Sequence, residues 1–333
     1  MDKKDAIRAG LIRRDMLALA MGMAGLSVAK AEDAPKFPER SLVYINLFPP
    51  GGTTDLLSRI YCSTMGEMLG QQVVVENRSG AGGTVGQAGI AQAEPDGYTV
   101  GLGSVASLSI APSTYPALPY VPAKDFTYIS GIWKVPNVLL TNLDLPAKSI
   151  PELIALLKKS PKRYSYASSG FGTSPHISME MFKKMAGVEV LHVPYRGGAP
   201  ATIDLLAGRV QMMFDNAPTG LTAARDGKVR ALAVTSADRV EMAPDIPTMR
   251  DYLSDFLITS WGGLVGPAGM PPAAVKRLTD ITHDALRDAK LLKLFTENAA
   301  TTWPTNSANF AKFQQDQEHL FAGLIKQSGA SID

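Results

Sequence analysis

Short apolar runs alternate with helical patterns along most of this chain of 333 residues. The run LVYINLF at 42–48 is typical of a buried strand. From Thr54 to Leu69, apolar residues recur every three or four positions, which predicts a helix with one buried face that Gly70 ends. Similar runs predict further strands at 72–76, 99–103, 165–168, 188–195, 210–214 and 229–236. This alternation is typical of an α/β fold.

The strand and helix patterns fall into two series. The middle of the chain, about 141–257, has a series of its own, and the residues on either side of it supply the other. The chain passes between the two series in extended runs near 137–142 and 257–262. Two lobes joined by two crossing strands are therefore expected, and such lobes can hinge and close on a ligand. The predicted bounds are 35–140 plus 258–333 for lobe 1 and 141–257 for lobe 2.

Three local expectations complete this outline. The strand VPNVLLTN at 135–142 is expected to follow a turn that Pro136 imposes. The segment 112–125 contains four prolines, which predicts an irregular surface loop. After the extended run WGGLVG at 261–266, two amphipathic helices are expected to complete the chain.

The first 31 residues have the features of an export signal. A basic head precedes an apolar stretch at 16–29, and Ala29-Lys30-Ala31 is a small-x-small cleavage pattern. The mature chain would begin near Glu32; the alternatives are a short buried helix or a retained anchor. The pair Arg13-Arg14 is similar to a twin-arginine signal, but its flanking residues depart from that pattern, so the general secretion route is nearly as well supported.

Removal of the signal changes the charge of the chain. The complete sequence has a formal net charge of +2, and residues 1–31 hold six Lys or Arg and three acidic residues, so the mature chain carries −1. A mildly acidic chain argues against nucleic acid as a partner. Cys62 is the single cysteine, which excludes an intramolecular disulfide, and its helical context predicts a small buried hydrophobe.

Two glycine-rich junctions contain the candidate chemistry: FPPGGTTD at 48–55 and SSGFGTSPH at 168–176. Each lies between an apolar run and a helical pattern, and each ends in hydroxyl residues that can cap a helix. The start of a helix offers unpaired N–H groups and a partial positive charge. Two such starts facing each other would bind a carboxylate without Arg or Lys. The alternative is that both are ordinary strand-to-helix turns.

Phosphate and metal sites are poorly supported. The first junction lacks the Lys of a Walker A loop, and Val85 replaces the third glycine of the dinucleotide fingerprint that Gly80 and Gly82 begin. The four histidines have no metal-ligand spacing. Arg78 and Arg196 lie beside glycine turns, where each is expected either to face a ligand or to pair with a neighbouring acid.

A hydrolase triad is a further alternative, with Ser169 or Ser174, His176 and Asp215 as its members. The sequence has no G-x-S-x-G elbow. His176 falls in the first turn of a predicted helix, which favours a supporting hydrogen bond to the loop. Asp215 follows a predicted strand, where it would accept a hydrogen bond from a ligand amine or hydroxyl, or cap a turn.

Together these segments resemble the extracytoplasmic solute receptors of tripartite tricarboxylate transport, also called the Bug family. The resemblance spans essentially the whole mature chain. It implies an α/β protein with the type II periplasmic binding protein fold, in which two lobes enclose a ligand cleft, and it implies a binding protein instead of an enzyme. The matching segments are FPPGGTTD at 48–55, VENRSGAGG at 75–83, EPDGYT at 94–99, SSGFGTSPH at 168–176, HVPYRGGAPA at 192–201, AGRVQMMFDN at 207–216 and WGGLVGP at 261–267.

The resemblance also implies how a ligand is held. Backbone amides of the two glycine loops, with ordered waters, would bind one carboxylate, while residues near Ser104 and Asp215 would face the variable end of the ligand. Pro175 departs from a full set of donors because it has no N–H. No metal and no cofactor are implied. The expected ligand-binding residues are Phe48, Pro50, Gly51, Gly52, Thr53, Thr54, Asp55, Ser104, Ser168, Ser169, Gly172, Thr173, Ser174, Tyr195 and Asp215.

The implied function is capture of a small carboxylate in the periplasm. The ligand would be a di- or tricarboxylate, an acidic amino acid or an aromatic acid. The implied partners are integral membrane transport subunits, contacted transiently by a monomeric receptor. The alternatives are a receptor that presents its ligand to a membrane sensor kinase, and a secreted Ser/His hydrolase.

Overall fold

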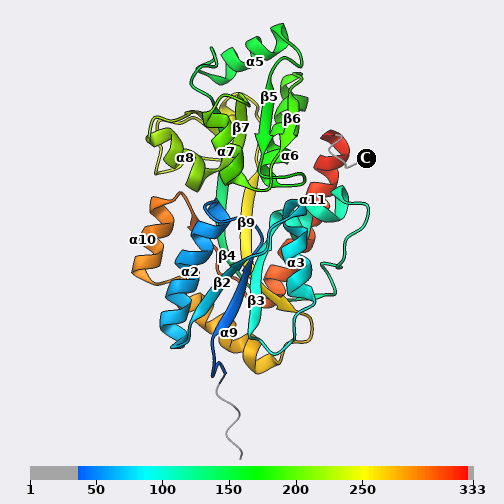
Figure 1. Cartoon of the computed structure of the whole chain (residues 1–333), viewed down its shortest axis with the longest axis vertical. Coiled ribbons are helices and arrows are strands. Elements are labelled where there is room, and N and C mark those ends of the chain that lie inside the picture. The colour runs from blue at the N-terminus through cyan, green and yellow to red at the C-terminus, as the bar shows by residue number, and fades with distance from the viewer. Residues whose placement is uncertain (1–36, 329–333) are drawn as a thin grey trace, which may run out of the picture. The chain divides into compact units, whose positions relative to one another are not determined.

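The computed structural model describes residues 37–328, so the expected export signal at 1–31 lies outside the described residues. Helices pack around a mixed β-sheet (Figure 1). The strands are β1 (Leu42–Asn46), β2 (Val73–Asn77), β3 (Thr99–Ser104), β4 (Phe126–Thr141), β5 (Ser165–Ser168), β6 (Leu191–Pro194), β7 (Met212–Asn216), β8 (Arg230–Val234), β9 (Thr259–Pro267) and β10 (Thr301–Thr302). The helices are α2 (Thr53–Leu69), η1 (Ala81–Gly83), α3 (Thr84–Ala91), η2 (Val105–Ile110), α4 (Ala111–Thr114), α5 (Ile150–Lys159), α6 (Ser174–Ala186), α7 (Gly198–Leu206), α8 (Ala217–Arg225), η3 (Met249–Asp251), α9 (Pro272–Ala285), α10 (Ala289–Glu297) and α11 (Ser307–Ser328).

The sheet has the strand order β2-β1-β3-β9-β4-β7-β5-β6, and β8 and β10 also pair with β4. Strand β1 pairs in parallel with β2 and β3, and β5 pairs in parallel with β6 and β7. Strands β4 and β9 run antiparallel to their neighbours. Parallel strands joined through helices are the α/β arrangement that the alternating pattern predicted, so that prediction is confirmed.

Strand β4 belongs to both halves of the sheet. Its residues 126–136 pair with β9, and its residues 137–141 pair with β7 and β8. We call lobe 1 the part that contains β1–β3, β9, β10 and the first part of β4, with α2–α4 and α9–α11. We call lobe 2 the part that contains β5–β8 and the end of β4, with α5–α8. Lobe 2 is the mostly green part in Figure 1.

The prediction of a turn before the strand at 135–142 is wrong, because Pro136 lies inside the continuous strand β4. Pro136 is the last residue of β4 that pairs with β9, opposite Thr259, and the next residue, Asn137, pairs with Asn216 of β7. A proline cannot donate a hydrogen bond to a sheet ladder. It is tolerated here because the strand exchanges one partner for the other at this residue.

Several helices were not expected from the sequence, among them η2, α4, α8 and α10. The prolines at 112–125 predicted a loop, but the π-helical η2 runs directly into α4, and Pro112 falls in the first turn of α4, where no N–H is needed. From Tyr115 to Asp125 the segment is irregular, as predicted. Helix α10 follows α9 and was missed, although Leu291 and Phe295 lie four residues apart on its buried face, as in an amphipathic helix.

No helix in the described part of the chain is both long and apolar enough to span a membrane.

Cys62 is buried on α2, with 2% of its surface exposed, which confirms its prediction as a small core residue. Burial raises the pKa of its thiol well above the ordinary value. The first turn of α2 and the first turn of α6 both point to the junction of the lobes, where the candidate site lies.

Candidate functional site

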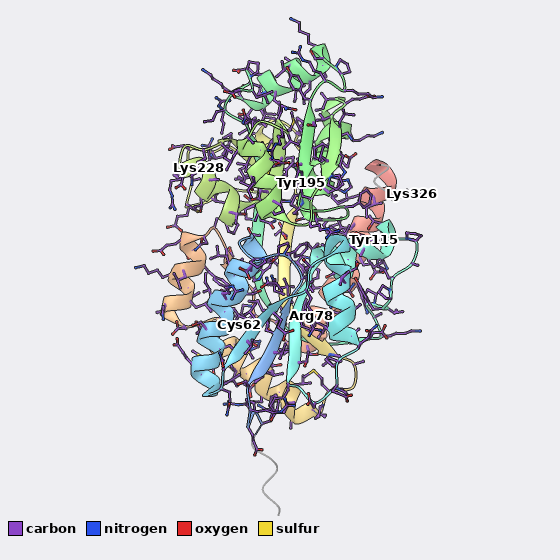
Figure 2. All side chains as sticks on the ribbon, in the orientation of Figure 1. Cys62, Arg78, Tyr115, Tyr195, Lys228 and Lys326 are labelled. Atoms are coloured by element: carbon purple, nitrogen blue, oxygen red, sulfur yellow. The ribbon has the colours of Figure 1, made fainter. Side chains whose placement is uncertain are left out.

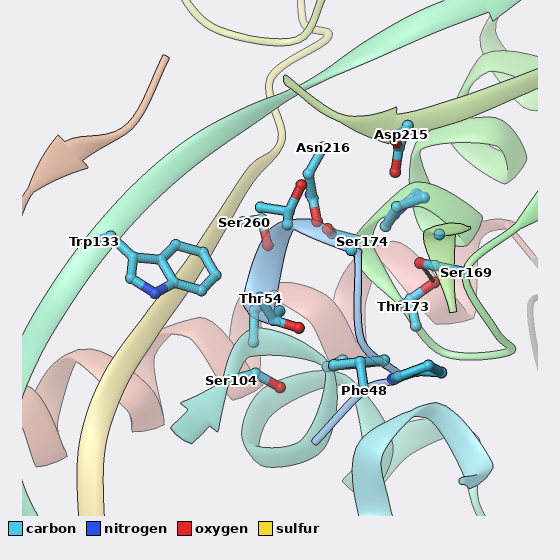
Figure 3. A pocket seen from close by; sticks show the side chains of 17 residues that line it. Phe48, Thr54, Ser104, Trp133, Ser169, Thr173, Ser174, Asp215, Asn216 and Ser260 are labelled. Carbon is cyan, nitrogen blue, oxygen red and sulfur yellow. Dashed lines mark hydrogen bonds between the residues drawn. The ribbon is translucent and has the colours of Figure 1, made fainter. Parts of the chain in front are cut away.

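A cavity lies where the lobes meet, between the start of α2 in lobe 1 and the start of α6 in lobe 2 (Figure 3). The part of the cavity that the centre of a water molecule can reach has a volume of about 40 Å³, so the cavity has room for a few waters. In this arrangement of the lobes, the cavity fits only a small group. The lining residues are Phe48, Pro49, Gly52, Thr53, Thr54, Ser104, Val105, Ala106, Trp133, Ser169, Thr173, Ser174, Pro175, Gly198, Asp215, Asn216 and Ser260.

Neither helix start at the cavity is capped by a side chain. Gly52 precedes α2 and Thr173 precedes α6, and no side-chain hydrogen bond caps either helix. The first hydrogen bonds within the helices are donated by Leu56 and Ile177, so the earlier N–H groups have no partner inside the helix. The hydroxyl of Thr54 is also buried without a hydrogen-bond partner. These free donors and the two helix dipoles favour an anion in the cavity.

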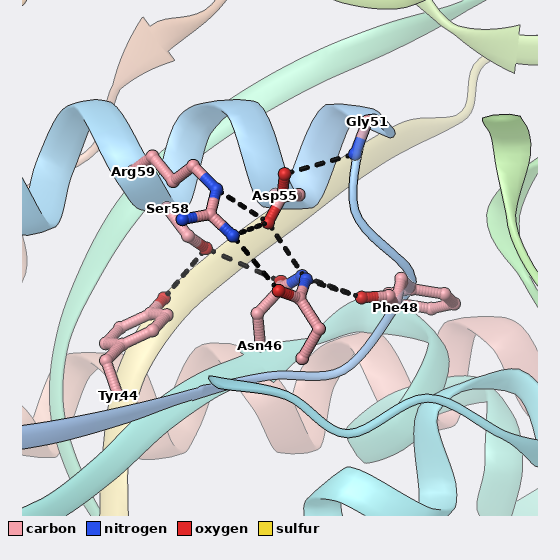
Figure 4. A network of polar contacts seen from close by, with 8 residues as sticks. Tyr44, Asn46, Phe48, Gly51, Asp55, Ser58 and Arg59 are labelled. Atoms are coloured by element: carbon pink, nitrogen blue, oxygen red, sulfur yellow. Dashed lines mark hydrogen bonds and ion pairs between the residues drawn. The ribbon is translucent and has the colours of Figure 1, made fainter. Parts of the chain in front are cut away.

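Asp55 does not line the cavity, although its place in the first glycine junction predicted contact with a ligand. Its carboxylate lies behind the first glycine loop and accepts hydrogen bonds from the Gly51 N–H (3.1 Å), Arg59 (3.0 Å) and Asn77 (2.9 Å) (Figure 4). Asn77 also donates to the carbonyl of Phe48 (2.9 Å). Burial raises the pKa of Asp55, but these hydrogen bonds outweigh burial and leave the pKa below its ordinary value. Asp55 therefore fixes the shape of the loop from behind.

Asp215 is the one charged side chain among the described residues that line the cavity. Its Oδ2 accepts a hydrogen bond from Thr219 (2.6 Å), and Thr219 Oγ1 lies 2.8 Å from Thr53 Oγ1 in lobe 1. Because Thr219 donates its hydrogen to the carboxylate, Thr53 donates to Thr219. Burial raises the pKa of Asp215 to about 6, against the opposing effect of hydrogen bonds from Thr219 and the Asn216 N–H. A chain of two hydrogen bonds thus links lobe 1 to a titratable group in lobe 2.

We expect Asp215→Asn to flatten the pH dependence of the free energy of unfolding between about pH 4 and pH 6. The folded protein keeps the Asp215 proton up to about pH 6, whereas an unfolded Asp releases it near its ordinary pKa of about 3.9. The folded state therefore binds more protons in this window, and stability falls as the pH rises through it. The full effect is about 3 kcal/mol.

Urea unfolding at a series of pH values measures this difference. The matched control is Asp238→Asn, which makes the same chemical change at an exposed position of lobe 2. Parallel pH profiles for the unmodified protein and Asp215→Asn would contradict a protonated Asp215 in the folded state.

The two lobes are in direct contact beside the cavity. The hydroxyl of Tyr115 donates to the carbonyl of Phe171 (3.4 Å), and the backbone of Gly82 packs against the same carbonyl. At another contact, the ring of Pro49 in lobe 1 packs against Gly197 in lobe 2. The structure therefore shows the lobes closed against each other.

The residues of the possible hydrolase triad are engaged elsewhere. The hydroxyl of Ser169 donates to Thr173 (3.2 Å), and His176 Nδ1 accepts a hydrogen bond from the Gly172 N–H (3.3 Å). Burial, together with nearby basic side chains, lowers the pKa of His176 to about 3, so its ring is neutral and free to accept this bond. The expected supporting role of His176 is confirmed. Pro175, beside it, removes one N–H from the first turn of α6.

Most of the residues expected to contact a ligand line the cavity: Phe48, Gly52, Thr53, Thr54, Ser104, Ser169, Thr173, Ser174 and Asp215. Two of the expected residues that do not line the cavity have other partners. The hydroxyl of Ser168 lies 2.7 Å from His192 Nε2, and the hydroxyl of Tyr195 donates a hydrogen bond to Asp204 (2.6 Å). The residues that lie outside the cavity are Pro50, Gly51, Asp55, Ser168, Gly172 and Tyr195.

Sequence reasoning missed the wall that the crossing strands supply. Trp133 comes from β4 and Ser260 from β9, and both line the cavity. The indole nitrogen of Trp133 is buried without a hydrogen-bond partner. No local pattern marks these residues, because their place in the wall follows from the pairing of β4 with β9 across more than a hundred residues. Asn216, beside Asp215, adds a polar side chain from β7.

Comparison with known proteins gives consistent results. Residues 57–330 match the family model described as "Tripartite tricarboxylate transporter family receptor". The structure of the periplasmic binding protein BugD has 34% sequence identity to this chain and a TM-score of 0.86, and the match covers 89% of this chain and 99% of that one.

Two further solved structures contain a named ligand. Rpa4515 of R. palustris with adipate has 31% identity and a TM-score of 0.87, over 89% of this chain and 99% of that one. MatC (Rpa3494) from Rhodopseudomonas palustris with bound malate has 30% identity and a TM-score of 0.82, over 87% of this chain and 100% of that one. The family match at 57–330 includes residues of both lobes and both crossing strands.

The fold and these matches confirm the type II periplasmic binding protein architecture with two lobes. They also confirm the family that the sequence segments resembled, whose members are binding proteins. The chain belongs to the tripartite tricarboxylate transporter receptor family, that is, to the Bug solute-binding receptors.

Proposed function

We propose that this protein captures a small organic carboxylate in the periplasm and delivers it to the integral membrane subunits of a tripartite tricarboxylate transporter. The observation that carries the proposal is the pair of uncapped helix starts at one enclosed cavity. Among the described residues, no Lys, Arg or His lines this cavity, so its donors for an anion are backbone N–H groups, side-chain hydroxyls such as that of Thr54, and the indole N–H of Trp133. The adipate and malate bound by the two similar proteins support this ligand class.

Closure of the lobes would trap the ligand. In the closed arrangement, the carboxylate is removed from water, and each hydrogen bond to it strengthens because the local dielectric constant is low. We propose that the two lobes move as two bodies, with β4 and β9 as the crossings between them. Lobe 1 would comprise residues 35–140 and 258–333, and lobe 2 would comprise residues 141–257. The few waters that the cavity can hold would be displaced, or would bridge the ligand to Asp215 and Trp133.

A thermal-shift experiment tests the proposed ligand class. A carboxylate at a hundred times its Kd stabilises the folded state by about 2.7 kcal/mol, which raises the Tm of a domain of this size by roughly 5 °C. The probes are adipate and malate, each compared with its uncharged diamide as the matched control. An equal rise with acid and amide, or no rise with any carboxylate in a panel that includes aromatic acids and acidic amino acids, would overturn the proposal.

A further inference from the structure

A second cavity adjoins the first, and we call it the vestibule. The space in it open to the centres of water-sized molecules is about 190 Å³, and its walls include Phe48 and Ser169, which also line the ligand cavity. Lobe 1 contributes the glycine turn at 80–83 and Tyr115, and lobe 2 contributes the segment 194–196. Figure 2 shows Tyr115 and Tyr195 on the facing ends of the two lobes. Because Phe48 and Ser169 line both cavities, the vestibule lies directly beside the ligand cavity, on the other side of these two residues.

Each cavity has one charged side chain among the described residues that line it, and the two charges have opposite signs. Asp215 lines the ligand cavity, and Arg196 lines the vestibule. Arg78, near the same glycine turn, pairs with Glu76 (2.8 Å) and does not line the vestibule. Arg196 is exposed and forms no ion pair with any described residue. Its positive charge is therefore available to a ligand.

The two acidic residues nearest in sequence to Arg196, Glu189 and Asp204, already have partners. Glu189 pairs with Lys162 (3.3 Å). Asp204 accepts hydrogen bonds from Tyr195 (2.6 Å) and from Arg209 (2.6 Å). Tyr195 also lines the vestibule, but its hydroxyl points to Asp204. The one charged side chain in the vestibule wall, among the described residues, is therefore the positive Arg196. The two charges therefore divide the enlarged site into a negative end at Asp215 and a positive end at Arg196.

This division decides where a second acidic group would go. If one carboxylate lies at the starts of α2 and α6, a second carboxylate beside Asp215 meets a like charge or a protonated acid in a narrow cavity. In the vestibule, it meets an unpaired guanidinium, which matches a carboxylate in shape and charge. The ring of Phe48, which belongs to both walls, offers an apolar surface for the carbon chain or ring between the two acidic groups.

We propose that the vestibule is a subsite for the second acidic group of a dicarboxylate, with Arg196 as its counter-ion. The proposal rests on the proposed function and narrows its ligand class from carboxylates in general to compounds with two acidic groups. It makes Arg196 a specificity-determining residue, although Arg196 lies outside the ligand cavity itself. The glycine turn at 80–83 forms part of the wall of the vestibule.

Isothermal titration with matched pairs of acids tests the subsite. Each pair differs by replacement of one carboxylate with a methyl group: adipate with hexanoate, malate with 2-hydroxybutanoate, and terephthalate with 4-methylbenzoate. For whichever pairs bind, we expect Arg196→Gln to weaken binding of the dicarboxylate about 2- to 5-fold and to leave binding of its monocarboxylate partner unchanged, because an exposed charge pair is worth up to about 1 kcal/mol. The loss should shrink as salt is added, because screening already weakens the pair in the unmodified protein.

The control is Arg225→Gln, which removes the same charge from an exposed position of lobe 2 outside both cavities. Equal loss for both members of a pair, or the same loss in both variants, would overturn the subsite and indicate general attraction of anions. No loss in Arg196→Gln for a dicarboxylate that binds would overturn it as well. Binding of none of the six acids to the unmodified protein, confirmed by the wider thermal-shift panel, would overturn the proposed function and the subsite with it.

Discussion

Thr53→Pro is expected to weaken carboxylate binding by about 10- to 150-fold while the fold is retained. Thr53 is the first residue of α2, a position where proline is favoured because no N–H is needed for the helix. Gly52 before it is extended (φ −89°, ψ 172°), as a residue that precedes proline must be. The substitution therefore removes one N–H from the cavity wall. A charge-assisted hydrogen bond to a carboxylate is worth about 1.5–3 kcal/mol, which gives this range of affinities.

The control for this experiment is Thr53→Val, which keeps the N–H group and the shape of the side chain. Both variants lose the hydroxyl contact with Thr219, so the difference between them isolates the backbone donor. Titration calorimetry gives the two affinities, and thermal unfolding checks that both variants fold. Equal affinity in Thr53→Pro and Thr53→Val would show that this amide does not hold the ligand.

Gly82→Ala is expected to reduce affinity by about 5- to 150-fold through a clash between the lobes. A Cβ atom on Gly82 would lie 2.5 Å from the carbonyl oxygen of Phe171 in lobe 2 and 3.0 Å from the hydroxyl of Tyr115. The first of these neighbours is backbone, which cannot rotate away. Overpacking of this kind costs about 1–3 kcal/mol. Because the clash with Phe171 exists only when the lobes touch, its cost falls on the closed state and is taken from the free energy of ligand binding, whereas the Tyr115 side chain, in the same lobe as Gly82, can rotate away.

Gly70 provides a matched control, because its backbone has nearly the same conformation. Gly70 has φ 64° and ψ 21°, Gly82 has φ 62° and ψ 19°, and a Cβ on Gly70 would meet nothing within 4 Å. Alanine therefore adds similar backbone strain at both positions, but only Gly82→Ala presses on the opposite lobe. Small-angle scattering with ligand should show Gly82→Ala less compact than Gly70→Ala. Equal affinity in the two variants would contradict the role of this contact in closure.

The features that sequence predicted correctly are local ones. The spacing of apolar residues from Thr54 to Leu69 and the glycine that follows them specify α2 without reference to the rest of the chain. The glycine junctions are likewise local, and residues from both helix starts do line one cavity, as the sequence predicted; that this cavity binds an anion stays a prediction.

The features that were missed depend on distant pairing. Pro136 indicated a turn, yet β4 continues through it, because β9 and β7 supply its partners from far along the chain. Trp133 reaches the cavity through this same strand. Asp55 was assigned to the ligand from its place in the loop, whereas Asn77 on β2 and Arg59 hold its carboxylate on the other side. In each case, the deciding contact joins segments whose proximity no local pattern shows.

The burial of Cys62 makes this chain convenient to convert into an optical sensor. Because the sole native thiol is shielded and has a raised pKa, it reacts poorly with maleimide dyes. A cysteine introduced at an exposed position, such as Ile203 on α7 or Val85 on α3, would then be the single site of labelling. A fluorophore placed there would report lobe movement without a background signal, and could be read directly in mixtures of candidate acids.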